Sequence, residues 1–444
     1  AHRYCRRGCR WCGRDNGRAV SVGEATTSSV PSLPSDRAPR VGIIGGGQLA
    51  RMMAQAAVSL GVEIHVLAGA SDEGVPGVFA SVTIGSPDDS AAIVAFAANV
   101  DVITFDHENV NWAALDALVA SGASVYPGPD TMRFADKALQ REHLARVGLP
   151  LPPFEIIDPA VPSADGGSIS KAVHAFVDAH GPKVIAKVSR GGYDGRGVFP
   201  LEGAEAAAEF VNDWCAATRA AADATPTGTS TAGVRLVLEP ALDLVAEVAV
   251  VTARRPGGEH ATYPVLETIQ RDGMCNEVVV PARLDDAVLE EASRIGAEVA
   301  LATGAVGVLA VELFITTGGS VLVNELAPRV HNSGHLTADA CVTGQFEQHL
   351  RAVLDLPLGD VSLRNPAAAM VNVVGAGASP EPRARLIDGM AVDPAAKVHL
   401  YAKTPKPNRK IGHVTVCDDS ADTALARATA VARALDGRKE NAGT

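Results

Sequence analysis

Residues 41–67 constrain the fold of this chain more than any other segment. An apolar run at 41–44 is followed by Gly45-Gly46-Gly47, and an apolar helical stretch then occupies 48–60. Gly61 ends that stretch, and a second apolar run continues to residue 67. Two strands joined through a helix pair in parallel, because a parallel pair needs a long crossover connection. The segment therefore predicts a strand–helix–strand unit within a parallel sheet.

The same alternation of strands and helices continues as far as residue 147. Further strand-like runs lie at 100–105 and 123–126, with alanine-rich helical stretches between them. This pattern predicts an N-terminal doubly wound parallel sheet over 41–147. Prolines at 150, 152 and 153 then mark a boundary.

The remaining chain alternates strand-rich segments with a few long helices, which predicts a mixed α/β and α+β protein. Its 444 residues are enough for about three domains. We expect a disordered basic extension at 1–40, the parallel-sheet domain at 41–147, a small subdomain with a glycine-rich loop at 148–235, a larger subdomain with a hairpin at 236–375, a β-rich C-terminal unit at 376–436 and a tail at 437–444.

Composition excludes several classes of protein. Hydrophobic residues make up 47% and charged residues 20%, values typical of globular rather than disordered chains. The longest apolar run, at 299–311, is shorter than the roughly 18 residues of a membrane span, so we expect a soluble protein. A net charge of −12 argues against a dedicated nucleic-acid binder. Seven cysteines in so long a chain indicate a reducing, cytoplasmic location.

The first 40 residues differ from the rest, because their net charge is +5 against −17 for the remaining chain. Cys5, Cys9 and Cys12 there have the CxxxCxxC spacing of an iron–sulfur site. Such a site needs an enclosing fold. The arginine-rich surroundings favour an unstructured extension with incidental cysteines.

The glycine turn at 45–47 fits the dinucleotide-binding fingerprint, with Ala50 in place of the last glycine. Such a turn brings backbone N–H groups and a helix N-terminus to a phosphate. A nicotinamide enzyme also needs an acid at the end of the second strand, and Asp72 and Glu73 come too late. We therefore favour another phosphate-bearing ligand, with a purely structural turn as the alternative.

A second glycine-rich segment, at 189–197, lies between two strand-like runs and predicts a hairpin loop. Its glycines allow the loop to fold over a polyphosphate and to supply backbone donors. Lys187, just before the loop, is placed to reach the same phosphates. A mobile surface hairpin is the alternative.

The hairpin at 311–325 predicts a metal site. If Gly318 and Gly319 form a two-residue turn, Glu312 and Glu325 face each other across the ladder. Two like charges about 4.5–5.5 Å apart at Cβ are destabilising unless a cation lies between them. Carboxylate oxygens with no Cys or His nearby suit Mg²⁺. The alternative is a slipped register with both glutamates facing solvent.

Two polar segments follow. Residues 328–335 contain arginine, two histidines, asparagine and serine, and beside a metal hairpin they indicate an anion site rather than loop hydration. Residues 401–410 concentrate four cations in an acidic chain. A phosphate pocket is favoured there over a solvated basic turn.

Together these motifs resemble the ATP-grasp superfamily of carboxylate–amine ligases. That superfamily combines metal-binding glutamates on a hairpin, a lysine before a glycine-rich hairpin loop, and a preceding parallel-sheet domain. Within it, the segments at 45–52, 191–197, 324–335 and 401–410 are similar to the 5-(carboxyamino)imidazole ribonucleotide synthases of purine biosynthesis. The resemblance covers about residues 41–435.

The resemblance implies an ATP-grasp fold, Mg²⁺, and a reaction of ATP, bicarbonate and 5-aminoimidazole ribonucleotide that gives the N-carboxylated product, ADP and phosphate. Bicarbonate is a poor electrophile, and its phosphorylation to carboxyphosphate supplies a leaving group. A closed, dry site protects that labile intermediate. A homodimer and transfer of the product to a separate mutase are also implied.

The family's site residues carry over position by position. Those implied in ATP binding are Lys137, Lys187, Gly192, Gly195, Gly197, Glu239, Leu242 and Glu247, and the metal ligands are Glu312 and Glu325. Those implied in ribonucleotide and bicarbonate binding are Gln48, Glu108, His331, Asn332, Ser333, Arg409 and Lys410. Those closest to the chemistry are Tyr193, Asp194, Arg329 and Lys403, with Asp194 orienting the amine or accepting its proton.

The chain departs from the family pattern at three places. Asp106 occupies the first acidic position of a motif that usually begins with glutamate, which leaves its role open. Lys137 stands where an arginine is usual. Pro240 in the implied adenine-binding hinge, 239–242, removes one backbone donor.

Three other functions compete with this one. A formate-dependent glycinamide ribonucleotide transformylase belongs to the same superfamily. A nicotinamide oxidoreductase would use the turn at Gly45 but lacks the strand-end acid. A non-catalytic nucleotide-binding protein would not need both Glu312 and Glu325.

Overall fold

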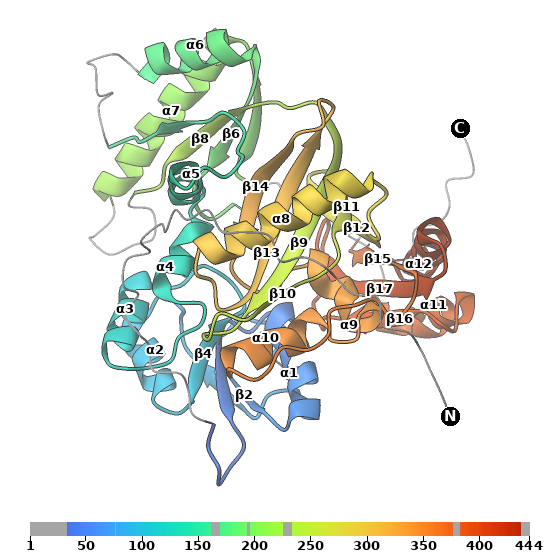
Figure 1. Ribbon diagram of the computed structural model, residues 1–444. Coiled ribbons are helices and arrows are strands. Elements are labelled where there is room, and N and C mark those ends of the chain that lie inside the picture. The colour runs from blue at the N-terminus through green and yellow to red at the C-terminus, as the bar shows by residue number, and fades with distance from the viewer. Residues whose placement is uncertain are drawn as a thin grey trace, which may run out of the picture.

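The computed structural model describes residues 33–75, 77–160, 169–192, 196–224, 233–375 and 382–436. Within these ranges the chain forms three sheets, with helices packed on each (Figure 1). The cysteines at 5, 9 and 12 and the expected extension up to residue 32 lie outside the described residues, as does the expected tail. No helix in the described part is both long and apolar enough to cross a membrane.

The N-terminal sheet is parallel and confirms the doubly wound prediction. Its strand order is β3-β2-β1-β4, from β1 (Arg40–Ile44), β2 (Glu63–Ala68), β3 (Ser81–Ile84) and β4 (Val102–Phe105). The helices are α1 (Gln48–Leu60), α2 (Ser90–Ala97) and α3 (Trp112–Ala120). The strand expected at 123–126 is only a single bridge between Ile103 and Val125. The edge strand β3 was missed because its side chains are all exposed and give no apolar run.

A short connection leads to the second sheet. It consists of α4 (Pro129–Met132), η1 (Arg133–Ala135) and α5 (Lys137–Arg146). The second sheet is antiparallel, in the order β5-β8-β6-β7, from β5 (Glu155–Ile157), β6 (Lys183–Val188), β7 (Val198–Glu202) and β8 (Leu236–Pro240). Helices α6 (Ile169–His180) and α7 (Ala204–Ala224) pack on it. The hairpin expected around the glycine-rich loop is β6–β7, and β8 extends this sheet past residue 235.

The third sheet has nine strands and runs in the order β14-β13-β9-β11-β12-β15-β17-β16, with β10 paired to β9. Its strands are β9 (Leu244–Arg254), β10 (His260–Thr262), β11 (Leu266–Arg271), β12 (Met274–Val280), β13 (Gly307–Thr316), β14 (Val321–Ala327), β15 (Ala367–Val374), β16 (Lys397–Leu400) and β17 (Lys410–Asp418). The C-terminal unit is therefore continuous with the larger subdomain, because β15 pairs with both β12 and β17.

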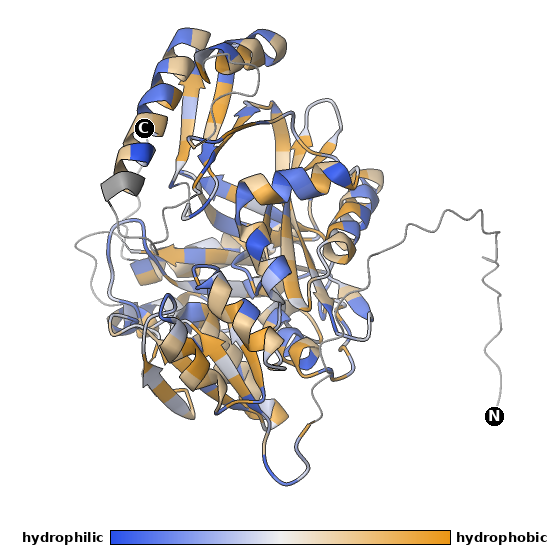
Figure 2. Cartoon of the chain, turned by 90° about the vertical axis from the view of Figure 1, so that its left-hand side faces the viewer, coloured by the Kyte–Doolittle hydropathy of each residue, from blue (hydrophilic) through white to orange (hydrophobic). Residues whose placement is uncertain are grey.

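Helices cover both faces of this sheet. Helix α8 (Asp286–Ala302) packs on one face of β9 and β13, and α10 (Gln345–Val353) packs on the other, against α1 of the N-terminal domain (Figure 1). The C-terminal elements are η3 (Pro382–Arg385), α11 (Leu386–Val392) and α12 (Ala421–Asp436), and η2 (Ser333–Leu336) and α9 (Thr337–Ala340) follow β14. The hydrophobic segments concentrate in the strands, and the hydrophilic ones lie on the outer faces of the helices (Figure 2).

The packing of the large sheet leaves part of one face open. Strands β9, β13 and β14 extend beyond the area that α10 and α1 cover. On that extension the side chains of Glu247, Glu312, Phe314 and Glu325 are only partly buried. The register pairs Phe314 with Glu247 and Glu312 with Glu325, so all four side chains lie on the same face of the sheet.

Candidate active site

The hairpin of β13 and β14 places Glu312 directly opposite Glu325, as predicted. The predicted two-residue turn is wrong. Thr316 and Ser320 close a three-residue loop, in which Gly319 has a φ of 80°. Relative to the prediction, that loop shifts the pairing near the turn by one residue, so that Leu313 pairs with Val323. A bulge on β14 then restores the predicted pairing of Glu312 with Glu325. The extra residue is Asn324.

The two acidic side chains form a pair that is open to a ligand. The side chain of Glu312 is 21% exposed and that of Glu325 is 40% exposed. Burial and the neighbouring charge of Glu325 raise the pKa of Glu312 to about 8. Burial also acts on Glu325, but Lys137, whose Nζ lies 2.9 Å from Glu325 Oε2, outweighs it and lowers the pKa of that carboxyl group. One of the two acids thus has a cation beside it and the other lacks one.

The donor set fits Mg²⁺, with one correction. The sequence predicted no histidine near the glutamates, but His331 Nε2 lies 3.7 Å from Glu312 Oε1. Burial and the charge of Arg329 lower the pKa of His331 to about 4, so its ring is neutral and would not balance the charge of an ionised Glu312. Two facing carboxyl groups, one of them without a cation directly beside it, suit a hard divalent cation once both are ionised.

Lys187 is held in a buried network of charges. Its Nζ lies 2.7 Å from Glu239 Oε2 and donates to Asn324 Oδ1 at 3.0 Å. The other oxygen of Glu239 lies 2.6 Å from Arg141 Nη2, which also donates to the carbonyl of Asn324. Burial opposes the charge of Glu239, but Arg141 and Lys187 outweigh it and lower its pKa. The network ties α5, the small sheet and the bulge of β14 together.

Two members of this network were missed from the sequence. Arg141 lies four residues after Lys137 on α5, so both side chains point from the same face of that helix. That spacing was the available signal. Asn324 gave none, because its role depends on the bulge. Glu239, implied in the adenine hinge, uses its side chain in this network, and its backbone pairs with Ile185 in the sheet.

The amide groups of the glycine turn at 45–47 are taken by the protein itself. Asp106 accepts from Gly47 N at 2.7 Å and from Ala50 N at 2.8 Å, and Asp72 accepts from Gly46 N at 3.1 Å. Asp106 therefore caps the N-terminus of α1, a structural role for the residue at the first acidic position of that motif. The turn positions Gln48, the first residue of the helix, rather than presenting free donors at these three amides.

Residues from both ends of the chain meet at the junction of the N-terminal and C-terminal parts. Lys403 Nζ donates to Gln48 Oε1 at 2.6 Å, across 355 positions of sequence. Arg409 Nη1 lies 2.9 Å from Glu73 Oε2, and the backbone N–H of Thr404 donates to the same oxygen. Glu73 was not predicted, since its partner is 336 residues away.

The polar segment after β14 divides into two groups. Arg329 Nη2 lies 2.6 Å from Glu108 Oε1, so two implied site residues pair with each other. Ser333 Oγ lies 2.9 Å from His331 Nδ1, which leaves His331 Nε2 toward Glu312. The side chain of Asn332 instead exchanges two hydrogen bonds with Asn372 and is buried.

Of the remaining implied residues, three lie outside the described ranges. The charge of Lys410 acts on both Glu312 and His331. Burial raises the pKa of Glu247 on β9. A side chain at Gly192 would meet the carbonyl of Arg196 at 2.6 Å, and Gly197 has a φ of 75°. Leu242 lies between β8 and β9. Tyr193, Asp194 and Gly195 lie outside the described residues.

Three known domain families match most of the chain. Residues 142–346 match the ATP-grasp domain, 39–136 the ribonucleotide synthetase preATP-grasp domain, and 368–427 the phosphoribosylaminoimidazole carboxylase C-terminal domain. The N5-carboxyaminoimidazole ribonucleotide synthase of Mycobacterium tuberculosis is 42% identical over 392 residues, which are 87% of this chain and 86% of the relative. The chain belongs to the N5-carboxyaminoimidazole ribonucleotide synthase family.

Solved structures agree with this assignment. The ADP complex of an N5-carboxyaminoimidazole ribonucleotide synthetase has a TM-score of 0.77 at 30% identity and covers 92% of this chain and 99% of its own. The synthase of Aspergillus clavatus with ADP and 5-aminoimidazole ribonucleotide has a TM-score of 0.73 at 28% identity and covers 90% of this chain and all of its own. These similarities confirm the prediction that the chain has the ATP-grasp fold and is a ligase.

The raised pKa of Glu312 predicts that Mg²⁺ binding releases protons. At pH 7 the metal-free Glu312 is mostly protonated, whereas a metal ligand must be ionised. We expect the apparent affinity for Mg²⁺ to rise with pH until about 8 and then to level off. Calorimetry in two buffers of different ionisation enthalpy measures the protons released. A Glu312→Gln variant that released as many protons would contradict this assignment.

The network around Glu239 predicts a large stability effect at Arg141. Arg141→Met leaves a buried carboxylate with one partner fewer, and we expect the free energy of unfolding to fall by about 3–5 kcal/mol. Urea denaturation measures it. Arg294→Met is the matched control, because its ion pairs with Glu291 and Glu298 are exposed and should contribute less than about 1 kcal/mol. Equal losses in the two variants would contradict the role of the network.

Proposed function

We propose that this chain carboxylates 5-aminoimidazole ribonucleotide with bicarbonate and ATP through carboxyphosphate, at the face that carries Glu312 and Glu325. The observation that supports this best is that two groups of cations from different elements act on or near that pair. The first group is Lys137, which pairs with Glu325, and Lys187, which lies over the ring of Phe314. The second is Arg329, which pairs with Glu108, and Lys410, whose charge acts on Glu312. A triphosphate and a second anion can thus meet over one pair of carboxylates.

The residues of the first group bind the nucleotide in this proposal. Lys137 and Lys187 neutralise phosphate oxygens, Glu247 binds the ribose, and the backbone of the 239–242 hinge contacts the adenine. Glu312 and Glu325 would hold Mg²⁺, which would supply positive charge to the phosphate oxygens. Backbone donors of Gly192, Gly195 and Gly197 are assigned to the phosphates in this proposal, and a dry site would protect an intermediate that hydrolyses readily.

The residues of the second group bind the other two substrates. Arg329, His331 and the backbone around Asn332 and Ser333 orient bicarbonate for attack on the terminal phosphate. Lys403 and Arg409 bind the phosphate of the ribonucleotide, with Gln48 and Glu108 against its other polar groups. Each of these cations already has a partner in the protein, either a carboxylate or the Gln48 amide. A substrate anion therefore replaces an existing polar contact and does not have to order a free side chain.

Tyr193 and Asp194 are proposed to act nearest the reacting amine. Asp194 orients the amine or accepts the proton that it loses as the C–N bond forms. A homodimer, a cytoplasmic location and transfer of the product to a separate mutase complete the proposal. The four cysteines that the structure describes are free thiols, which accords with a reducing compartment.

The substrate requirement tests the reaction. We expect ADP release to depend on both bicarbonate and 5-aminoimidazole ribonucleotide, because bicarbonate accepts the γ-phosphate and the ribonucleotide accepts the carboxyl group. A coupled assay for ADP with each substrate omitted in turn measures this. Activity with formate and glycinamide ribonucleotide would support the transformylase instead, and NADH binding by fluorescence would support the oxidoreductase.

Arg409→Ala tests the ribonucleotide site. Loss of a charge-assisted hydrogen bond of about 1.5–3 kcal/mol predicts a KM for the ribonucleotide raised by about 10- to 100-fold, with the KM for ATP nearly unchanged. Steady-state kinetics separates the two constants. Arg294→Ala, on the exposed face of α8, serves as the control for loss of a surface arginine. An equal rise in the KM for ATP would place Arg409 elsewhere.

A further inference from the structure

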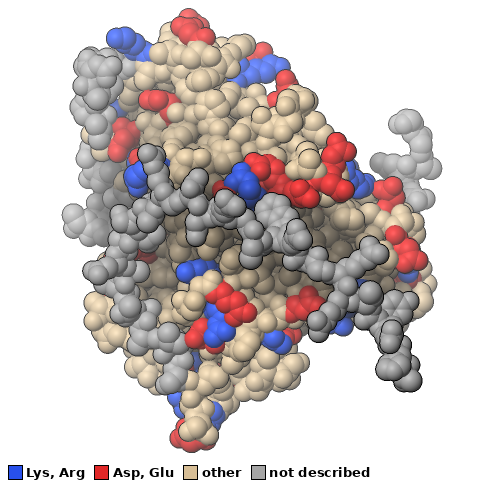
Figure 3. All heavy atoms as spheres, viewed as in Figure 1, with Lys and Arg blue, Asp and Glu red and all other residues tan. Residues whose placement is uncertain are grey.

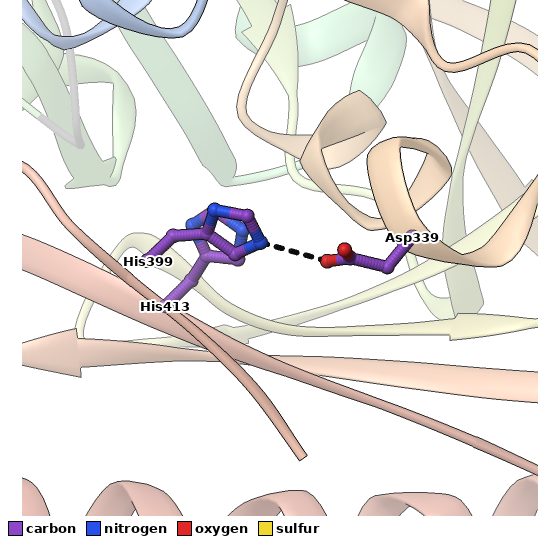
Figure 4. A group of neighbouring side chains, drawn as sticks. All are labelled: Asp339, His399 and His413. Carbon is purple, nitrogen blue, oxygen red and sulfur yellow. Dashed lines mark hydrogen bonds and ion pairs between the residues drawn. The ribbon is translucent and has the colours of Figure 1, made fainter. Parts of the chain in front are cut away.

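Two histidines face each other across the outermost pair of strands in the large sheet. His399 on β16 pairs with His413 on β17 in the antiparallel register, so their side chains leave the sheet on the same face. Asp339 on α9 packs over that face (Figure 4). None of these three residues belongs to the site described above.

The three side chains approach one another closely. His399 Nε2 lies 2.8 Å from Asp339 Oδ2, and the two imidazole rings stack with centroids 4.5 Å apart. One nitrogen from each histidine and one oxygen from Asp339 lie within 4.8 Å of one another. His413 is fully buried, and the other two are partly buried.

His413 has an atom that the fold leaves without a hydrogen bond. Its Nδ1 lies 2.7 Å from the hydroxyl of Tyr401, whereas its buried Nε2 has no partner. Thr415, two residues along the same face of β17, also has a buried hydroxyl without a partner. A buried polar atom without a partner lowers the stability of the fold by about 1–3 kcal/mol. Two such atoms on one face therefore indicate that a ligand binds there.

We propose that Asp339, His399 and His413 bind a divalent transition-metal ion. Two imidazoles and one carboxylate suit Zn²⁺ or a neighbouring ion of the same series rather than Mg²⁺. When His413 Nδ1–H donates to the hydroxyl of Tyr401, the lone pair of the ring is on the unpartnered Nε2 and is available to a metal. The hydroxyl of Tyr401 then stays on Nδ1 as the partner that fixes the orientation of the ring.

Binding requires a small contraction and the displacement of one proton. Ligand atoms about 2.0–2.2 Å from a tetrahedral zinc ion lie about 3.4 Å apart, so the rings must tilt out of their stack. The metal takes the place of the proton between His399 Nε2 and Asp339 Oδ2, and that proton moves to Nδ1 of a neutral ring or to solvent from a charged one.

The position of this site gives it a role in the synthase. Residues 401–409 connect β16 to β17, and they carry Lys403 and Arg409. An ion bound to His399 and His413 would join the two strands at the base of that connection and fix them to α9. The ring of His335, which contacts Gln48, lies 5.2 Å from the ring of His413. The ion therefore orders the ribonucleotide-binding segment without contacting substrate, a role that rests on the proposed function.

Zinc titration of the full chain tests the site. Zn²⁺ binding is measured by competition with a coloured chelator in a chain whose Cys5, Cys9 and Cys12 are replaced by serine, so that those thiols do not bind the ion. We expect Asp339→Asn and His399→Gln to bind one equivalent less than this parent chain, and His260→Gln, at an exposed histidine of β10, to lose none. Equal stoichiometry in all four chains would overturn the proposal.

A second measurement remains informative if the ligand variants fold poorly. Zn²⁺ should raise the melting temperature of the parent chain and of His260→Gln but leave that of Asp339→Asn unchanged. Co²⁺ bound by the parent chain should show the visible absorption of a tetrahedral site, absent from Asp339→Asn. A Zn²⁺-induced rise of the same size in the melting temperature of Asp339→Asn would overturn the proposed metal site. Loss of ribonucleotide carboxylation alone would bear only on the proposed function.

Discussion

Two carboxylates that face each other across one hairpin determine what the surrounding residues must do. Glu312 and Glu325 pair directly across adjacent strands, so the free energy of their repulsion has to be offset locally when both are ionised. Lys137 balances one of them, and the raised pKa of the other reflects a carboxyl group that has no cation directly beside it. In the proposed function Mg²⁺ would supply the missing positive charge.

The buried charges nearby follow from the same requirement. Lys187 is proposed to bind phosphate, yet burial lowers its pKa and favours the neutral amine. Glu239 opposes that effect, and Arg141 in turn balances Glu239. The bulge at Asn324 adds a carbonyl and a side-chain oxygen as acceptors for both cations. A local irregularity in the hairpin therefore supports the charge state of a lysine on another sheet.

The sequence predicted the parts of this design that depend on neighbouring residues. Strand–helix alternation gave the parallel sheet, and the spacing of Glu312 and Glu325 gave their pairing, although a three-residue turn and a bulge cancelled each other's effect on the register. Contacts between distant segments were not predictable. Glu73 with Arg409, Asp106 at the start of α1, and Asn332 with Asn372 depend on how the domains meet, which no local pattern encodes.

Net charge was a poor guide to the ligands of this chain for a physical reason. The face in Figure 3 shows basic side chains scattered among acidic ones, as a net charge of −12 suggests. The cations proposed to bind substrates are buried or partly buried, with Lys137 and Lys187 only 12% and 10% exposed. Surface charges are screened within about 10 Å by salt, whereas buried ones are screened much less. An acidic exterior and a proposed anion-binding site are therefore compatible, because the phosphates of the substrates would respond mainly to the few cations close to them.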